Sequence, residues 1–461
     1  MEPVKVEQFT GESTVMSQRR KNKYFRDPIH GFIEVSQVAL SIVNHPLFQR
    51  LRRIKQLGLA EYVFHGATHT RFEHSLGVMK IAEDILRFTN VGLTRNKASD
   101  GSITNNFESQ KIILAALLHD IGHFPLSHTF EKKMKEKLKL EGHEVYSKAI
   151  IERTSIKDIL TDNSFSNNDI QDIVTYILGH HVQPFPVQII HSELDADRLD
   201  YLLRDSLYCG VKYGIYDLDR LLISLDRYND QLIVTARGRH AVEEFIFARF
   251  YMYRQVYIHK TKRAFEILAN KVVERLIDKG LISYPSPNDN LEEKLVYLDD
   301  IWLFSKLRCL YRLNEIDDYT KMLIGMLLFR RPIKLVKELE EYTDKEDPRF
   351  SKEFTKLEQI LEYKKFIDAL KEESISPEEH IFIDGPAIEV KQTPYYTSPE
   401  KEDEEKSHTI YILDRDETLK DIAEIKESII KEIVAKKLWV IRVYTLDEYR
   451  PIVEKMIKKF L

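Results

Sequence analysis

The stretch Ile112-Ile113-Leu114-Ala115-Ala116-Leu117-Leu118-His119-Asp120-Ile121-Gly122-His123 decides the fold. Its first seven residues are all apolar, which is typical of a helix buried in a protein core. The helix then meets His119 and Asp120, and burying an unpaired polar group costs roughly 2–7 kcal/mol. A divalent metal ion satisfies both side chains, because imidazole nitrogen and carboxylate oxygen are good ligands for Mg, Mn, Fe or Zn. His123 follows one turn later on the same face. The stretch therefore predicts a helical core with a metal site at a helix end.

A second polar cluster lies at residues 194–205. At about 100° per residue, Arg198, Tyr201 and Asp205 fall within roughly 100° of Asp197. The opposite half of this helix carries leucines, namely Leu199, Leu202 and Leu203. The helix therefore presents a stripe suited to a phosphate-containing ligand. In this interpretation Asp197 holds metal, Arg198 pairs with phosphate oxygens and Asp205 accepts from a sugar hydroxyl.

A third segment supplies Arg71 and His74 just before another helix. Three helices thus offer four metal ligands: His74, His119, Asp120 and Asp197. Such a set leaves coordination positions open for water and substrate. A metal ion there can generate hydroxide and polarise a phosphoryl oxygen.

Hydrophobic periodicity predicts a mainly α fold. Residues 38–279 are dominated by helical patterns, and residues 291–337 read as further helices. Asn229 and Asp230 lie between short apolar runs, which predicts a small β-hairpin. The end of the chain predicts an α+β lobe, with strands at 380–383, 409–413 and 438–444 and helices at 417–435 and 446–460. We expect a flexible tail (1–23), a helical domain (24–337), a charged helical linker (338–379) and a C-terminal α+β lobe (380–461).

Composition narrows the class of protein. The 461 residues carry a net charge of −5, which argues against a general nucleic-acid binder. Two cysteines, Cys209 and Cys309, form no CxxC pair and favour a reducing, cytoplasmic setting without disulfides. No apolar run approaches the roughly 20 residues that cross a bilayer, so we expect no membrane association.

The motifs together resemble a known family. The chain is similar to the HD-domain deoxynucleoside triphosphate (dNTP) triphosphohydrolases, especially the SAM-and-HD-domain enzymes and their bacterial relatives, here without a SAM domain. The likeness covers about residues 24–265 and is carried by residues 27–31, 48–58, 71–78, 119–123 and 194–205. It implies an HD-superfamily helical core. It also implies hydrolysis of a dNTP to deoxynucleoside and inorganic triphosphate, with attack at the α-phosphorus.

The resemblance implies a role for each residue of the site. It implies metal binding by the four ligands named above. It implies that His123, His128 and His143 line the α-phosphate, that His128 gives a proton to the leaving 5′ oxygen, and that Asp195 is an active-site acid. It implies phosphate contacts by Arg71, Arg198 and Arg249, with Arg198 replacing a common Lys. It implies sugar contacts by Gln56, Leu57, Tyr201 and Asp205, with Tyr257 excluding a ribose 2′ hydroxyl.

The resemblance also implies assembly and regulation. Many relatives are tetramers activated by nucleotides bound between subunits, so we expect a homo-tetramer or a dimer–tetramer equilibrium. Gln49 and Arg52 match positions that read guanine there. Phosphate contacts are expected at Lys23, Arg237, Arg239, His259 and Lys260. Asn44 stands where an Asp would read guanine, and Arg26 stands where the better-known enzyme has Asn.

Two alternatives stay open at this point. The chain could be an HD phosphohydrolase for mono- or cyclic nucleotides. It could instead be a non-hydrolytic module that senses nucleotides or single-stranded nucleic acid. His143 either orients a water or phosphate in the site or caps its own helix. For the pair His180-His181 we predict a structural or surface role.

Overall fold

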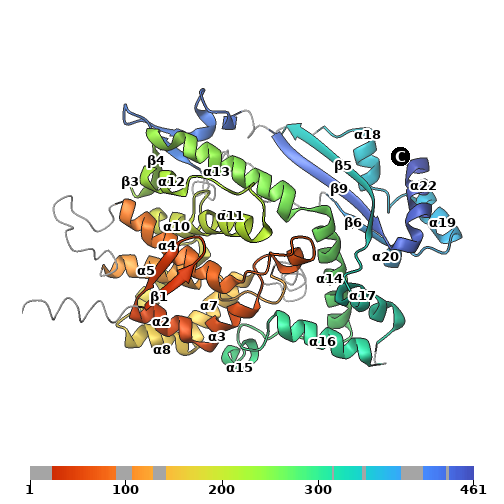
Figure 1. Cartoon of the computed structure of the whole chain (residues 1–461), viewed down its shortest axis with the longest axis horizontal. Coiled ribbons are helices and arrows are strands. Elements are labelled where there is room, and N and C mark those ends of the chain that lie inside the picture. Colours follow the sequence, from red (N-terminus) through yellow and green to blue (C-terminus); the bar gives the residue numbers. More distant parts are fainter. Residues whose placement is uncertain are drawn as a thin grey trace, which may run out of the picture.

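The computed structural model describes residues 23–89, 106–127, 142–313, 316–344, 349–385, 409–431 and 436–461. Most of this is a helical body, and a smaller unit of sheet and helices lies beside it (Figure 1). The predicted mainly α class is confirmed. Within the described ranges, no helix is both long enough and apolar enough to cross a membrane. Residues 1–22 of the predicted N-terminal tail lie outside these ranges.

Helices make up the body between residues 37 and 328. They are α2 (Gln37–Asn44), α3 (Pro46–Gln49), α4 (Arg71–Phe88), α5 (Phe107–Leu118), α7 (His143–Arg153), α8 (Ser155–Asp162), α9 (Asn167–Leu178), α10 (Pro184–Ile190), α11 (Ala196–Cys209), α12 (Leu218–Ser224), α13 (Arg239–Met252), α14 (Lys260–Asp278), α15 (Leu291–Leu295), α16 (Asp300–Arg312) and α17 (Asp318–Leu328). Short 3-10 turns are η1 (Arg50–Arg53), η2 (Gly58–Tyr62) and η4 (Ala236–Gly238). A π-helical turn, η5 (Tyr253–Tyr257), follows α13 directly.

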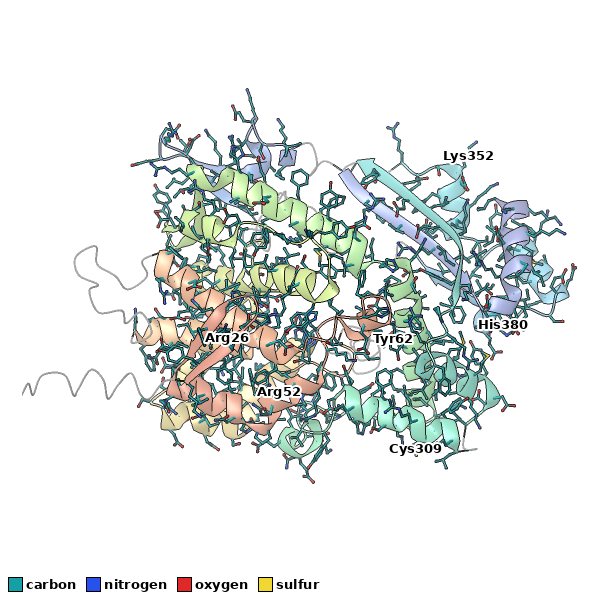
Figure 2. All side chains as sticks on the ribbon, in the orientation of Figure 1. Arg26, Arg52, Tyr62, Cys309, Lys352 and His380 are labelled. Atoms are coloured by element: carbon teal, nitrogen blue, oxygen red, sulfur yellow. The ribbon has the colours of Figure 1, made fainter. Side chains whose placement is uncertain are left out.

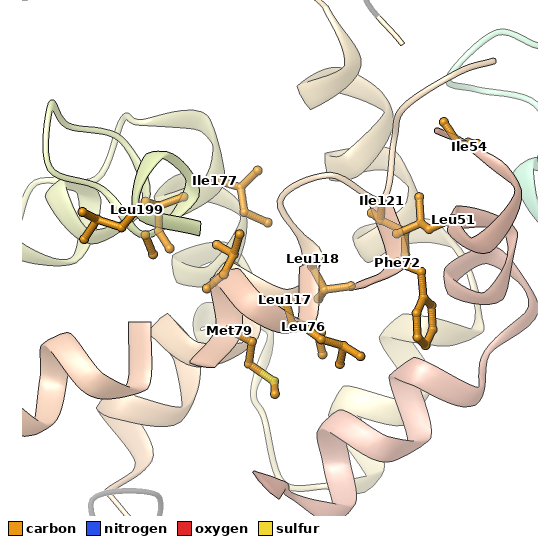
Figure 3. Close-up of a cluster of buried hydrophobic side chains, with 14 of the residues drawn as sticks. Leu51, Ile54, Phe72, Leu76, Met79, Leu117, Leu118, Ile121, Ile177 and Leu199 are labelled. Atoms are coloured by element: carbon orange, nitrogen blue, oxygen red, sulfur yellow. The ribbon is translucent and has the colours of Figure 1, made fainter. Parts of the chain in front are cut away.

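The centre of the body is the packing of α4, α5 and α11. As the sequence predicts, residues Leu114 to Leu118 of α5 are almost completely buried. Figure 3 shows Leu117 and Leu118 lying among Leu76 of α4 and other apolar side chains. These helices have well-defined starts, since Thr70 and Glu73 form a capping box for α4 and the Asp195 carboxylate caps α11. The packing fixes which helix ends meet, and this decides where the polar residues converge.

An N-terminal hairpin precedes the helices. Strands β1 (Lys23–Asp27) and β2 (Gly31–Val35) pair antiparallel, and Gly31 at φ 71° provides the left-handed turn residue. The Asp27 carboxylate accepts from the backbone N–H groups of Ile29 and His30. Lys23, which we expected in the flexible tail, is therefore the first residue of a strand, because the partner strand satisfies its backbone.

The predicted hairpin at Asn229 and Asp230 is confirmed. Strands β3 (Leu225–Tyr228) and β4 (Gln231–Thr235) flank two residues with φ of 49° and 61°, as a two-residue turn of this kind requires. However, β4 also pairs in parallel with β7 (Tyr411–Leu413), which pairs with β8 (Leu419–Asp421). This part of the expected C-terminal lobe therefore belongs to a sheet on the helical body (Figure 1).

The expected helix at 417–435 is wrong over its first part. Glu417 has φ 64° and ends a turn in which the Asp414 N–H donates to the Thr418 carbonyl. The Asp416 carboxylate also accepts from the Thr418 N–H. These local hydrogen bonds favour a hairpin over a helix. A 3-10 turn, η7 (Ile422–Glu424), follows β8.

The second unit is built on a sheet of order β5-β9-β6. Its strands are β5 (Lys334–Asp344), β6 (Ile381–Asp384) and β9 (Lys436–Thr445). Its helices are α18 (Lys352–Glu358), α19 (Lys364–Glu372), α20 (Pro377–His380) and α22 (Arg450–Phe460), and a 3-10 turn, η8 (Asp447–Tyr449), precedes α22. The strands predicted at 380–383 and 438–444 and the helix predicted at 446–460 are confirmed.

The helical linker expected from residue 338 is corrected at its start. The boundary between 337 and 338 falls inside β5, an eleven-residue strand that pairs with β9. Pairing with a distant strand overrides the helix-like Glu and Lys content of this segment. Further along the expected linker, helices α18 and α19 are present, and their apolar faces pack in one cluster with β9.

The second unit touches the helical body beside η5. Ile258 packs with Leu438 and Val440 of β9, and Tyr253 of η5 joins this cluster. The Arg263 guanidinium donates to the Asp384 carboxylate at 2.7 Å. Figure 2 shows Lys352 and His380 on this unit and Arg26 and Arg52 on the helical body. The contact lets the sheet support the turn that carries Tyr257.

Candidate active site

Four predicted metal ligands converge at one point of the helical body. They are His74 from α4, His119 and Asp120 from the end of α5, and Asp197 from the first turn of α11. The Nε2 atom of His74 lies 2.9 Å from Oδ1 of Asp197 and 3.7 Å from Oδ2 of Asp120. The Nε2 atom of His119 lies 3.4 Å from Oδ1 of Asp120 and 3.9 Å from Oδ1 of Asp197. Three helix ends therefore bring two imidazoles and two carboxylates together.

The orientation of both imidazoles suits a metal ion. His119 Nδ1 lies 2.8 Å from the Ala116 carbonyl and His74 Nδ1 lies 2.8 Å from Asp200 Oδ2, so both Nδ1 atoms carry the proton. Each Nε2 then faces the carboxylates. Burial lowers the pKa of His74, but Asp197 and Asp200 outweigh it and raise this pKa to about 10, so a bound cation would take the place of the Nε2 proton. The Nε2 atom of His119 makes no hydrogen bond within the described part of the chain, although it is buried. A divalent cation fits this donor set.

The charges of the site also favour a cation. Burial raises the pKa of Asp120, but the Arg71, His119 and His123 side chains outweigh it and hold this pKa well below its usual range. Burial also raises the pKa of Asp197, but contact with His74 outweighs burial and lowers this pKa to about 2. Both carboxylates are therefore ionised at neutral pH, and a bound cation offsets their mutual repulsion.

A buried network behind His74 was missed in the sequence analysis. Asp200 accepts from His74, from His30 Nε2 at 2.6 Å and from Arg204 at 2.7 and 2.8 Å. Arg204 also donates to Asp27 of the N-terminal hairpin at 2.9 Å. Gly77 makes room for it, because a Cβ there would lie 1.9 Å from Asp200 Oδ1. The spacing of Asp200 and Arg204 by one helical turn was the available signal.

A second group of histidines lies beside the ligands. The rings of His123 and His143 stack at 3.6 Å, and His123 Nε2 lies 3.1 Å from Asp120 Oδ1. Gly122 permits this, since a Cβ there would come within 2.3 Å of the His143 carbonyl. His143 is the first residue of α7 and faces Asp120, so it is brought into the site. His128 lies outside the described residues.

One cavity of about 390 Å³ joins these groups. All eight residues predicted to hold phosphate or sugar line it: Gln56, Leu57, Arg71, Arg198, Tyr201, Asp205, Arg249 and Tyr257. So do His119, Asp120, His123, His143, Asp195 and Asp197, whereas His74 lies fully buried behind them. Lining residues that the sequence analysis missed include Glu144, His191, Tyr253, Lys262 and Glu266. The volume is within the range usual for small-molecule sites.

Acidic partners hold the three predicted phosphate-binding arginines. Arg71 donates to Asp120, Arg198 to Asp195, and Arg249 to Glu193. The Arg198 guanidinium also donates to the Ser192 carbonyl at 2.6 Å. These contacts hold the guanidinium groups at the cavity wall, where they can meet an anionic ligand. Glu193 was not anticipated from the sequence.

The cavity also carries a phenol and carboxylate pair. The Tyr257 hydroxyl donates to Asp205 Oδ2 at 2.7 Å, and the Tyr201 and Tyr257 rings meet edge to face at 6.0 Å. Tyr257 is the last residue of η5, and π-helical turns are frequent at functional sites. This part of the cavity offers aromatic faces and acceptor oxygens, and the Lys262 ammonium beside them donates to the Tyr257 carbonyl at 3.1 Å.

The predicted regulatory residues lie elsewhere. None of the seven lines the cavity: Lys23, Gln49, Arg52, Arg237, Arg239, His259 and Lys260. Gln49 Oε1 accepts from Arg52 Nε at 2.9 Å, and the Arg52 guanidinium lies over the Phe72 ring. His259 and Lys260 begin α14, Arg237 lies in η4 and Arg239 begins α13. His181 lies 3.3 Å from Asp172 and also stays outside the cavity.

Family matches cover nearly all of this architecture. Residues 71–205 match the HD domain, and residues 216–461 match the HD associated region. The second match alone spans more than half of the chain. The four predicted metal ligands lie inside the first match, and both the β3-β4-β7-β8 sheet and the β5-β9-β6 sheet lie inside the second.

Known proteins are similar to this chain over more than half of its length. The uncharacterized protein YwfO of Bacillus subtilis (strain 168) is 32% identical over 424 residues, which cover 90% of each chain. The deoxynucleoside triphosphate triphosphohydrolase SAMHD1 homolog of Dictyostelium discoideum is 30% identical over 265 residues, covering 55% of this chain and 49% of that protein. This chain thus spans about half the length of that SAMHD1 relative.

Two crystal structures are similar over almost the whole chain. A hypothetical protein from Aquifex aeolicus has a TM-score of 0.71 at 28% identity, covering 95% of this chain and 100% of that one. A phosphohydrolase from Bacteroides thetaiotaomicron has a TM-score of 0.66 at 26% identity, covering 92% and 100%. The family matches, together with the geometry of the predicted ligands, show that this chain belongs to the HD-domain phosphohydrolases that carry an HD-associated region.

Proposed function

We propose that this protein hydrolyses dNTPs to deoxynucleoside and inorganic triphosphate. The observation that carries the proposal is one cavity in which guanidinium groups and carboxylates that could bind a metal ion lie together with Tyr201, Asp205 and Tyr257. A triphosphate and a deoxyribose need both kinds of surface. The SAMHD1 homolog of Dictyostelium discoideum, which is named a deoxynucleoside triphosphate triphosphohydrolase, supports the same substrate class.

The metal quartet defines the reacting end. His74, His119 and Asp197 lie close enough together to hold a divalent ion such as Mg, Mn, Fe or Zn, and Asp120, whose Oδ2 lies 3.7 Å from His74 Nε2, would complete the set. When bound, such an ion supplies a Lewis acid for phosphoryl oxygens and lowers the pKa of water to near neutrality. The remaining steps fall to the side chains of this chain.

The arginines offset phosphate charge. Arg71, Arg198 and Arg249 present guanidinium groups that can bind phosphate oxygens in bidentate fashion. Asp195, through its contact with Arg198, sets where that guanidinium points. These cationic groups lower the barrier because they are already oriented before charge develops.

Histidines beside the α-phosphate handle the proton. His123 and His143 are stacked within reach of Asp120, which keeps them at the cavity wall. We propose that they orient the α-phosphate and that His128 donates a proton to the leaving 5′ oxygen. General acid catalysis of this kind contributes roughly 10²–10⁴-fold.

The sugar lies against the opposite wall in this proposal. Asp205 and Gln56 accept from its hydroxyl, Leu57 and Tyr201 pack on its carbon face, and Tyr257 lies where a ribose 2′ hydroxyl would project. The ring of Tyr257 is fixed by its hydrogen bond to Asp205, so the exclusion is rigid. A deoxyribonucleotide is therefore preferred over a ribonucleotide.

A product assay tests the proposal. Purified protein receives each dNTP singly and all four together, with Mg or Mn, and the products are resolved by ion-exchange chromatography. We expect equal amounts of deoxynucleoside and inorganic triphosphate, and none from the Asp197→Asn variant. If nucleoside monophosphates or cyclic nucleotides are hydrolysed instead, another HD phosphohydrolase activity is the correct assignment. If nucleotide binds without turnover, the protein is a sensing module.

We further propose that a nucleotide activator bound between subunits promotes a tetramer. The support is the Gln49–Arg52 pair together with the cationic residues Lys23, Arg237, Arg239 and Lys260 and with His259. Gel filtration with and without dNTPs tests this, alongside rates in single and mixed nucleotides. An oligomer and a rate that both stay unchanged would exclude activation.

A further inference from the structure

Asp205 is held from both sides at the sugar end of the cavity. The side chain is almost completely buried, and the Tyr257 hydroxyl donates to its Oδ2 at 2.7 Å. On the other side, His69 Nε2 lies 2.7 Å from Asp205 Oδ1. An ionised carboxylate only accepts hydrogen bonds, so His69 Nε2 carries a proton and donates it.

Tyr257 remains a donor at neutral pH. Burial and the neighbouring Asp205 carboxylate hold the pKa of Tyr257 well above its usual range. A carboxylate offers about four lone-pair positions, and these two contacts use two of them. Asp205 lines the cavity, so its remaining acceptor capacity is available to a ligand.

His69 itself is rigidly placed. It lies in the loop between η2 and α4 and is 1% exposed. Its ring stacks on Tyr208, with centroids 4.7 Å apart and planes at 22°. Tyr208 lies on α11, the helix that carries Asp205, so the stacking and the hydrogen bond fix His69 against the same helix.

The backbone of His69 contacts a second cavity residue. Its carbonyl accepts from the Gln56 N–H at 3.0 Å, and the adjacent pair Lys55 and Thr70 forms a β-bridge. Gln56 Oε1 is buried and has no hydrogen-bond partner among the described residues. Gln56 also lines the cavity, and its amide oxygen is therefore a second acceptor that needs a donor.

We infer that His69 is a positioning residue for sugar recognition: its side chain orients Asp205, and its backbone places Gln56. This inference rests on the proposed function. A wall that offers two acceptors selects a ligand with a hydroxyl donor at that position. In a deoxynucleotide the sugar hydroxyl available for this is the 3′ hydroxyl. His69 therefore makes the enzyme sensitive to the 3′ hydroxyl without touching the substrate.

Two substitutions separate positioning from simple packing. His69→Leu fills similar space but removes the donor, whereas His69→Gln keeps an amide nitrogen near the position of Nε2. Each variant and the wild type receive a dNTP and its 2′,3′-dideoxy counterpart, and kcat and KM are measured for both. The ratio of the two kcat/KM values reports recognition of the 3′ hydroxyl alone.

We expect His69→Leu to lower this ratio by about tenfold or more, because a hydrogen bond to a charged group is lost in orienting the acceptor. The fall should come from a higher KM for the dNTP, with the dideoxy reaction little changed. His69→Gln should restore the ratio to within about threefold of the wild type. If His69→Leu slows both substrates equally, or leaves the ratio unchanged, His69 has no positioning role.

A matched control variant, a replacement variant and a binding measurement accompany this experiment. His181→Leu removes a histidine that contacts an aspartate outside the cavity, and it should leave the ratio unchanged. If His69→Leu does not fold, His69→Asn, whose amide is too short to reach Asp205, replaces it. Isothermal titration with both nucleotides gives the same ratio without turnover. The ratio from titration tests the role of His69 even if the wild type releases no triphosphate. A wild type that releases no triphosphate would refute only the proposed function.

Discussion

His74 Nδ1 lies 2.8 Å from Oδ2 of Asp200, a fully buried carboxylate on the neighbouring helix that does not line the cavity. Burial raises the pKa of Asp200, but Arg204 and the two histidines outweigh it and keep this pKa well below its usual range. Asp200 therefore stays ionised and holds the His74 ring with Nε2 toward the other ligands. Partners of this kind strengthen metal sites without touching the metal.

Asp200→Asn should weaken metal binding. The amide replaces one acceptor of His74 and Arg204 with a donor, and losing such an outer partner typically costs about 10–100-fold in metal affinity. Titration calorimetry with Mn²⁺ measures the change. Asp384→Asn is the matched control, since Asp384 is a buried aspartate that pairs with Arg263 far from the ligands. An affinity within twofold of the wild type for Asp200→Asn would contradict this role.

Gly77→Ala should destabilise the fold although alanine favours helices. The added Cβ would lie 1.9 Å from Asp200 Oδ1 and 2.5 Å from Arg204 Nη2. Overpacking of this kind costs about 1–3 kcal/mol, which outweighs the gain of roughly 1 kcal/mol in helix propensity. Urea denaturation measures the unfolding free energy. The exposed substitution Ser41→Ala should change it by no more than about 0.5 kcal/mol. A stabilised Gly77→Ala protein would show that Asp200 can move.

Metal should stabilise the folded chain through the quartet. A ligand that binds only the folded state adds about 2.7 kcal/mol at 100 times its dissociation constant. We expect the melting temperature to rise with Mn²⁺ and to fall after chelation with EDTA. The Asp197→Asn variant, which lacks one ligand, should show a much smaller rise. Equal shifts in both proteins would place the binding site elsewhere.

Asp300 should make stability depend on pH. Its carboxylate accepts from the backbone N–H groups of Leu126 and Lys55 at 2.8 and 3.0 Å and so holds two segments beside the cavity. Burial nevertheless raises the pKa of Asp300 to about 6. The folded chain thus binds this proton more tightly than the unfolded chain does. Its contribution to the unfolding free energy is fully present below about pH 4 and is lost as the pH rises through 6.

Asp300→Asn removes this titration. The unfolding free energy of the wild type relative to the variant should fall by up to about 3 kcal/mol between pH 4 and 7. Urea denaturation at several pH values measures both proteins. Asp384→Asn, at a buried aspartate that pairs with Arg263, serves as the control. A difference that is flat over this range would show that Asp300 keeps an ordinary pKa.

Local sequence patterns predicted the elements whose structure depends only on residues close by in the sequence. The apolar run that ends at His119 predicted the buried helix α5, and the Asn229-Asp230 pair predicted the β3–β4 turn. The stripe of Asp197, Arg198, Tyr201 and Asp205 followed from helical periodicity, and all four line one cavity. The family resemblance supplied the residues that are distant in sequence, such as Gln56 and Arg249.

Local sequence patterns did not predict the strands that pair with distant segments. Residues 338–344 are rich in Glu and suggested a helix, yet they lie in β5, where Glu338 pairs with Arg442 of β9. The segment around residue 411 suggested part of a separate lobe, yet β7 adds to the hairpin of the helical body. Strand partners can be a hundred residues away, so no local propensity specifies them.

The sequence by itself determined which helix faces are polar, because helical geometry relates residues three and four apart whatever surrounds them. It therefore gave the ligand types and the stripe on α11. Only the tertiary structure decided what lies behind them. Asp200 and His69 make these contacts because α4, the N-terminal hairpin, the loop before α4 and α11 meet within hydrogen-bond distance. Such contacts depend on the packing of distant segments, which places a buried donor against a buried acceptor only once the core has formed.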